Sequence, residues 1–196
     1  MQNRFTESEK KTLLRLAREA IESAVDPAHH AVKFDLHSLP PALRECKTSF
    51  VTLYNGDQLR GCIGGLMAEH ALAEDVRIHA AAAATKDFRF PPVRADEIPQ
   101  LSIEISVLST PEPLEYEGPD DLIGKLRPGE DGVILQQGVR RATFLPQVWK
   151  KIPDPERFLG MLCEKAFLPP DAWKSGKLQV FTYQVLPICE ADLKDE

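Results

Sequence analysis

The strongest constraint on the fold is a β-hairpin predicted between residues 48 and 63. Residues 48–54 are rich in β-branched and aromatic side chains, and Asn55-Gly56 follows them directly. An Asn-Gly pair between two such runs is the strongest short hairpin signal, because both residues accept a left-handed backbone. The second strand then runs from about Gln58 to Ile63. Two strands joined by so short a turn must pair antiparallel.

Other segments show the signals of further helices and strands. We expect helices over residues 6–25, 69–86, 119–126 and 155–167, and strands over 101–108, 132–137, 140–145 and 178–186. A Thr-x-x-Glu capping box opens the first helix, and an Asp-Pro pair opens the last. Residues 27–47 are expected to be irregular. Because hairpins and helices follow no regular strand-helix-strand order, we predict an α+β fold with a mostly antiparallel sheet flanked by helices.

Composition excludes several classes of protein. The 196 residues carry a formal net charge of −6, which argues against bulk binding of nucleic acid or of an anionic membrane. No stretch is apolar enough for a transmembrane helix, and the first ten residues do not form a signal peptide, so we expect a cytoplasmic protein. The four cysteines are widely spaced and form no Cys-x-x-Cys pair. They are therefore expected to be free thiols, with no metal site and no cofactor.

Cys62 is the cysteine best placed for chemistry. Glycines bracket it, and their amides could hold an anion or an oxyanion. Arg60, two residues earlier, would point to the same face of a regular strand, and a guanidinium there favours the thiolate. A second interpretation is a small buried residue in a tight turn, since free cysteine is among the most buried residue types. The sequence leaves both interpretations open.

Two other segments carry side chains suited to acid–base or anion-binding chemistry. Glu104 lies between Ser102 and Ser106 on one face of an apolar strand, where it is either a general base or part of a solvated outer face. Asp87 and Arg89 follow the alanine-rich helix. Arg89 either clamps a carboxylate or phosphate, or forms with Asp87 an internal ion pair that locks the loop.

Histidines give weaker signals. His79, within the alanine-rich helix, either faces the cysteine as a base or is the satisfied partner of a carbonyl, and the second is the commoner case. His29 and His30 have no third ligand at a suitable spacing, so no metal site is expected there.

The motif around Cys62 resembles that of a known family. Leu59-Arg60-Gly61-Cys62-Ile63-Gly64 is similar to the signature hexapeptide of the AMMECR-type family, and of its bacterial subgroup called AmmeMemoRadiSam system protein A. Further similar blocks, in the same order, lie at residues 50–53, 80–92, 103–109, 131–135 and 143–149. Together they cover most of residues 10–186. One departure is Phe88, which stands where the family has proline.

The resemblance implies a fold and partners but no reaction. Family members are similar α+β proteins with a larger antiparallel-sheet lobe and a smaller lobe, which here would be drawn from about residues 110–150 of a single domain over 1–196. Bacterial members are associated with a Memo-type protein and a radical S-adenosylmethionine enzyme. These are therefore the protein partners to expect, with no nucleic acid and no membrane.

Two functions are compatible with these observations. The first is an enzyme, or an enzyme component, that acts on a small anionic or carbonyl-containing molecule. Its catalytic residues would be Cys62, Glu104 and Asp87, and its substrate-binding residues Arg60, Gly61, Ile63, Gly64, Arg89 and Ser106. We expect Cys62 and Glu104 to line one cleft, with side chains within roughly 10 Å. The second is a non-catalytic adaptor that docks a Memo-type or radical S-adenosylmethionine partner.

Overall fold

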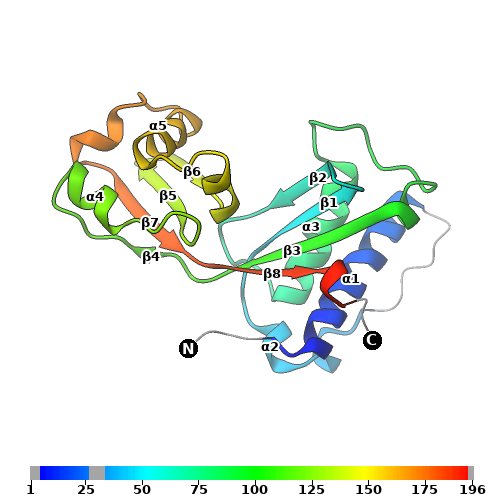
Figure 1. Cartoon of the computed structure of the whole chain (residues 1–196). Helices are drawn as coiled ribbons and strands as arrows, with labels where there is room; N and C mark the ends of the chain where they lie inside the picture. Colours follow the sequence, from blue (N-terminus) through cyan, green and yellow to red (C-terminus); the bar gives the residue numbers. More distant parts are fainter. Residues whose placement is uncertain (1–4, 27–33, 194–196) are drawn as a thin grey trace. The chain divides into compact units, whose positions relative to one another are not determined.

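The computed structural model describes residues 5–26 and 34–193, so His29 and His30 lie outside the described residues. The chain divides into two compact units (Figure 1). Unit 1 comprises residues 1–107 and 186–196, and unit 2 comprises residues 108–185. The second unit thus extends well beyond the segment 110–150 from which a smaller lobe was expected. The fold is α+β, as predicted.

Unit 1 is built on a four-stranded sheet with the order β2-β1-β3-β8. Its strands are β1 (Ser49–Asn55), β2 (Gln58–Gly64), β3 (Leu101–Leu108) and β8 (Val185–Cys189), and its helices are α1 (Glu7–Val25), α2 (Pro41–Arg44) and α3 (Leu72–Thr85). The predicted capping box starts α1: the Glu9 amide donates to Thr6 Oγ1, and the Thr6 amide donates to the Glu9 carboxylate. The described part of residues 27–47 is more ordered than expected, because it contains α2 and a short 3-10 turn at Leu36–Ser38.

One face of this sheet carries the core of unit 1. Val51 and Leu53 on β1, with Ile103 and Ile105 on β3, are fully or almost fully buried in one cluster with α1 and α3. Both helices lie on one side of the sheet in Figure 1. Because side chains alternate along a strand, Thr52 and its neighbours in register point to the opposite face.

The predicted hairpin forms, with its turn one residue later than the Asn-Gly pair suggests. Asn55 pairs with Gln58, so Gly56 and Asp57 are the two loop residues. Gly56 has φ +58°, and Asp57 has no positive φ. Glycine at the first loop position of such a turn fits type II′, which follows the twist of the flanking strands. The turn sets the register that carries Cys62 to its place on β2.

Unit 2 holds a second four-stranded sheet, with the order β4-β7-β5-β6. Its strands are β4 (Glu112–Pro113), β5 (Gly132–Gln137), β6 (Arg140–Phe144) and β7 (Gln179–Tyr183), and its helices are α4 (Pro119–Lys125) and α5 (Pro155–Lys165). The predicted strand over 178–186 is wrong in one respect. It breaks at Gln184 into β7 and β8, which belong to different sheets. In the core of unit 2 the rings of Trp149 and Phe158 stack with centroids 3.6 Å apart.

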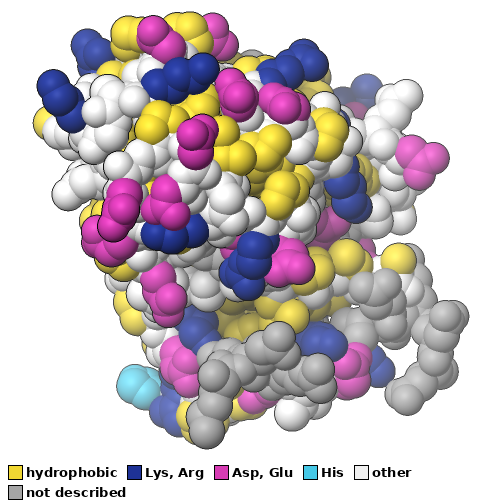
Figure 2. All heavy atoms as spheres, turned by 60° about the vertical axis from the view of Figure 1, so that its left-hand side comes forward, with side chains coloured by type: hydrophobic (Ala, Val, Ile, Leu, Met, Phe, Trp, Pro, Cys, Tyr) yellow, Lys and Arg dark blue, Asp and Glu magenta, His cyan; other side chains and the backbone are white. Residues whose placement is uncertain are grey.

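Charged side chains of both signs occur together on one face of the molecule (Figure 2). On the face shown in Figure 2, Lys and Arg are interspersed with Asp and Glu among the described residues. Over the described ranges, none of the helices has the length and apolar character needed to cross a bilayer.

Candidate functional site

Cys62 and Glu104 lie in one row across the sheet of unit 1. Thr52 is the register partner of both: it pairs with Cys62 on β2 and with Glu104 on β3. Directly paired residues point to the same face, and adjacent strands are about 4.8 Å apart, so the two outer residues are separated by roughly 10 Å. The register places both side chains on one face of the sheet, and the expectation that they line one cleft stays a prediction. The row faces away from α1 and α3.

Polar groups surround the thiol on this face. Thr52 Oγ1 donates a hydrogen bond to Cys62 Sγ at 3.4 Å. Burial, and next the negative charge of Glu104, raise the pKa of Tyr54; Cys62 and Cys189 contribute in the same direction. Tyr54 therefore keeps its proton at neutral pH and can donate a hydrogen bond. Thr52, Tyr54, Cys62 and Glu104 share this face of the sheet, and we call them, together with Cys189, the thiol row.

The backbone of Cys62 is held by an ion pair from the loop that follows α3. The Cys62 amide donates to Asp87 Oδ2 at 2.8 Å, and Arg89 Nη2 donates to the Cys62 carbonyl at 3.2 Å. Arg89 Nη2 and Nε also donate to the Asp87 carboxylate at 2.6 and 2.9 Å. Because β2 is an edge strand, this ion pair supplies the bonds that a further strand would make.

The bonding of Asp87 determines what it can do. Its side chain is 3% exposed, and the hydrogen bonds from Arg89 hold its pKa well below the usual range, with the Cys62 amide adding to the effect. A carboxylate with this pKa is a poor proton acceptor, so the geometry favours positioning over the proton transfer expected from the sequence. Arg89 is 45% exposed, and none of the hydrogen bonds described for it uses Nη1.

The glycines beside Cys62 serve packing. A Cβ on Gly61 would lie 2.3 Å from the Ala83 carbonyl oxygen on α3, and a Cβ on Gly64 would lie 2.3 Å from the Phe50 ring. The backbone groups of Cys62 point away from β1, so those of Gly61 and Ile63 point toward β1 and its ladder. These two amides are therefore not available as an oxyanion hole. The Gly64 amide, like that of Cys62, points away from β1 toward the open edge of the sheet.

Arg60 differs from its expected placement. The ladder pairs Leu53 with Gly61 and Tyr54 with Leu59, so Arg60 is the extra residue of a β-bulge. Its guanidinium donates to Glu97 Oε2 and to two carbonyls, those of residues 91 and 92. These bonds hold the loop after α3 in place. They also occupy the Arg60 guanidinium, which was expected to favour the Cys62 thiolate or to bind substrate.

His79 lies on the other side of the sheet from Cys62. It belongs to α3, and its Nδ1 is 3.1 Å from Asp75 Oδ2, which also accepts from the Ser49 amide and hydroxyl at 2.8 and 2.7 Å. Its ring faces Gly65. The hypothesis of a histidine base beside the cysteine is therefore wrong, and the satisfied-partner interpretation holds with a carboxylate in place of a carbonyl.

The members of the site differ from those expected from the sequence. Ser106, expected to bind substrate, is only 1% exposed and pairs with Phe50, so a ligand cannot reach it from solvent. Thr52, Tyr54 and Cys189 join the site instead. The signal for the first two was the alternation of residues 50–54, which places Thr52 and Tyr54 on the same face. Over the described ranges, no group of three or more His, Cys, Asp or Glu side chains is arranged to hold a metal ion.

Comparisons with known proteins give one consistent result. A family model described as AMMECR1 matches residues 14–188. A protein of Thermofilum pendens is 39% identical and covers 98% of this chain and 95% of its own length. A protein of Methanothermobacter thermautotrophicus is also 39% identical, covering 92% and 93%. Among solved structures, an uncharacterized protein from Pyrococcus horikoshii has a TM-score of 0.83 at 34% identity, covering 93% of this chain and 92% of that one.

Proposed function

This chain belongs to the AMMECR1 family, as the hexapeptide around Cys62 predicted, and from that premise we propose that it is an enzyme or enzyme component with Cys62 as its reactive thiol. One observation carries the proposal. The Asp87–Arg89 pair binds both backbone groups of Cys62 while Thr52 donates to its sulfur. A cysteine that only fills space on the strand does not need the hydrogen bond from Thr52 to its sulfur. Positioning of this kind is typical of activated nucleophiles.

The substrate class follows from the groups around the sulfur. The thiolate would add to the carbonyl carbon of a small molecule: a sulfur–carbon bond forms, and the carbonyl π pair moves to oxygen. The thiol proton passes to Glu104 through intervening water. The free Nη1 of Arg89 would bind an anionic group of the substrate, and the Tyr54 hydroxyl would donate a hydrogen bond to the oxygen on which negative charge develops.

Removal of the Thr52 hydroxyl tests this arrangement. Thr52→Val keeps the shape but deletes the donor to sulfur, so alkylation of Cys62 by iodoacetamide at neutral pH should slow by about three- to tenfold. Thr52→Ser keeps the hydroxyl and is the matched control, with a rate close to that of the wild type. Peptide-resolved mass spectrometry measures both rates. Equal rates in the valine and serine variants would contradict a role for this hydrogen bond.

A second function is favoured by one exposed side chain. Phe88 lies between Asp87 and Arg89 and is 96% exposed, which is unusual for an aromatic residue. In this alternative the protein is an adaptor, and the loop docks a Memo-type protein or a radical S-adenosylmethionine enzyme of a bacterial AmmeMemoRadiSam system in the cytoplasm. An exposed aromatic residue is a common anchor of such contacts. The adaptor needs no reactive thiol, so Cys62 chemistry distinguishes the two functions.

A further inference from the structure

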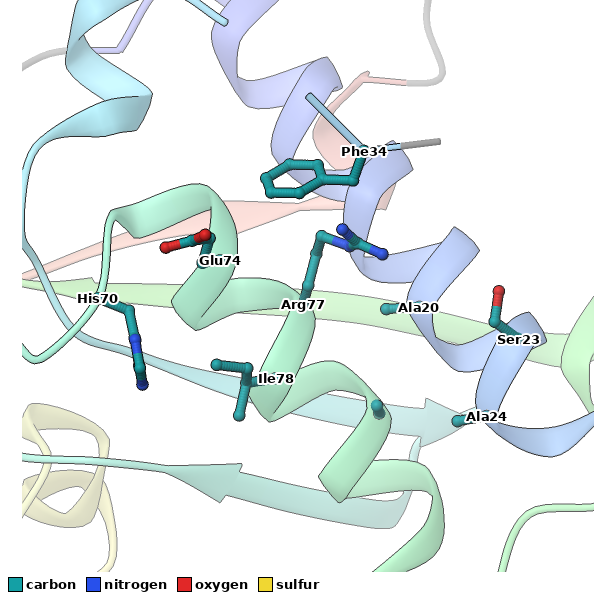
Figure 3. A pocket seen from close by; sticks show the side chains of 9 residues that line it. Ala20, Ser23, Ala24, Phe34, His70, Glu74, Arg77 and Ile78 are labelled. Atoms are coloured by element: carbon teal, nitrogen blue, oxygen red, sulfur yellow. The ribbon is translucent and has the colours of Figure 1, made fainter. Parts of the chain in front are cut away.

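An open surface cavity with a volume of about 570 Å³ lies between α1 and α3 (Figure 3). It belongs to the helix layer of unit 1, so the sheet separates it from the thiol row. It is lined by Ala20, Ser23, Ala24, Phe34, His70, Glu74, Arg77, Ile78 and Ala81. Small side chains on both helices leave the space open, and most of the lining is apolar. This is the composition of a site for the apolar part of a small molecule.

The cavity contains a guanidinium with no described counter-charge. Arg77 Nε is buried and has no hydrogen-bond partner, and the guanidinium carbon lies 4.2 Å from the centre of the Phe34 ring. No hydrogen bond or ion pair is described for this side chain within residues 5–26 and 34–193. A buried donor is normally satisfied, so the unpartnered Nε marks a hydrogen bond that the described residues do not supply. Arg77 therefore presents the bonding capacity that a carboxylate would use.

The charges at the rim restrict the ligand further. In Figure 3 the Arg77 guanidinium extends toward α1 beneath Phe34, while the Glu74 carboxylate lies on the other side of the arginine stem. One positive group at one end of an apolar cavity suits one negative group on an apolar body. A ligand with a second negative charge would meet Glu74, which disfavours it by like-charge repulsion.

We propose that this cavity binds a small monocarboxylate whose body is an aromatic ring or a branched hydrocarbon. Its carboxylate bonds to the Arg77 guanidinium, which the Phe34 ring holds in place by stacking. Its body contacts the apolar wall formed by Ala20, Ala24 and Ile78. The proposal does not depend on the function assigned to Cys62.

Titration calorimetry with three probes tests the charge and the apolar requirement together. Phenylacetate should bind the wild-type protein with a dissociation constant on the order of millimolar or tighter. Phenylacetamide has the same shape without the charge and should bind at least about tenfold more weakly, because it cannot form a charge-assisted bond. Acetate has the charge without the apolar body and should also bind at least about tenfold more weakly. Equal affinity for phenylacetate and phenylacetamide, or no saturable binding of phenylacetate, overturns the proposal.

Three variants locate the binding. Arg77→Gln should weaken phenylacetate binding by about tenfold to a hundredfold. Arg15→Gln is the matched control, because Arg15 lies on α1, is 56% exposed, pairs with Glu19 and does not line the cavity, so binding should be unchanged. Ala24→Leu fills the cavity from an exposed position and keeps the arginine, so it should also weaken binding even if Arg77→Gln fails to fold. Wild-type affinity in either Arg77→Gln or Ala24→Leu overturns the proposal.

Discussion

Replacement of Asp87 with alanine is expected to lower the free energy of unfolding by about 3 kcal/mol, among the largest effects of a single substitution in unit 1. The carboxylate is 3% exposed and accepts from the Cys62 amide and from Arg89. Its loss leaves the amide of an edge strand without a partner and an arginine without its counter-charge. Urea unfolding at neutral pH measures the change.

The control for this prediction is a second Asp–Arg pair with the same spacing. Arg94 pairs with Asp96 in the next loop, but both side chains are largely exposed. Exposed ion pairs contribute little, so Asp96→Ala should leave the urea midpoint almost unchanged. Equal destabilisation by the two substitutions would show that burial and the bond to Cys62 are not what makes Asp87 important.

The same carboxylate predicts a pH dependence. The pKa of Asp87 is lowered in the folded protein, whereas an aspartate in the unfolded chain has a pKa of about 3.9. The stabilisation is therefore fully present above that value and is lost as the pH falls below it, because the unfolded chain then binds a proton that the folded protein does not. The stability difference between the wild type and Asp87→Asn should thus narrow below about pH 4. A constant difference across this range would contradict the hydrogen-bonded arrangement.

Replacement of Gly61 with alanine is the second substitution with a large expected effect. The added Cβ would lie 2.3 Å from the Ala83 carbonyl oxygen, which is backbone within α3 and cannot rotate away as a side chain can. Either β2 or α3 must shift, and overpacking of this kind costs about 3 kcal/mol. For a protein of this size, that lowers the melting temperature by about 6 to 12 °C.

Gly65→Ala is the matched control for Gly61→Ala. Gly65 lies on the same side of the chain four residues later, and its Cβ would approach side-chain atoms, the nearest being Thr48 Oγ1 at 3.3 Å. A side chain can move by a few tenths of an ångström, so the melting temperature should fall much less. If Gly61→Ala melts like the wild type, the close contact between β2 and α3 is not as tight as the structure indicates.

The local elements of the fold were largely predictable because their signals are local. The capping box at Thr6, the cap at Asp154 and the turn at Gly56 each depend on a few neighbouring residues. The break at Gln184 was not predictable. Residues 179–183 and 185–189 both have strand character, and only tertiary pairing assigns them to different sheets.

The sequence indicated which residues lie near the candidate site better than it indicated what each of them does there. Alternation along 101–108 correctly placed Glu104 on the face opposite the core, but a bulge redirected Arg60, which no period-two pattern can foresee. The glycines suggested a loop that binds anions, whereas the contact of Gly61 with α3 requires knowledge of where the helix packs. The alternative of His79 as a base beside Cys62 failed for the same reason, because the helix that carries His79 lies on the other side of the sheet.

Alkylation of the native protein shows whether the fold holds Cys62 as a reactive thiol. Cys46 is the internal reference, since it is exposed whereas Cys62 is half-buried. Each rate with iodoacetamide at neutral pH is divided by the rate of the same cysteine in the urea-unfolded chain. At neutral pH only a few per cent of an ordinary cysteine side chain is ionised, so a cysteine whose thiolate is stabilised can react about tenfold faster. We predict that folding accelerates Cys62 relative to Cys46. A Cys62 that folding protects, while Cys46 reacts as it does in the unfolded chain, would contradict the claim and favour the adaptor.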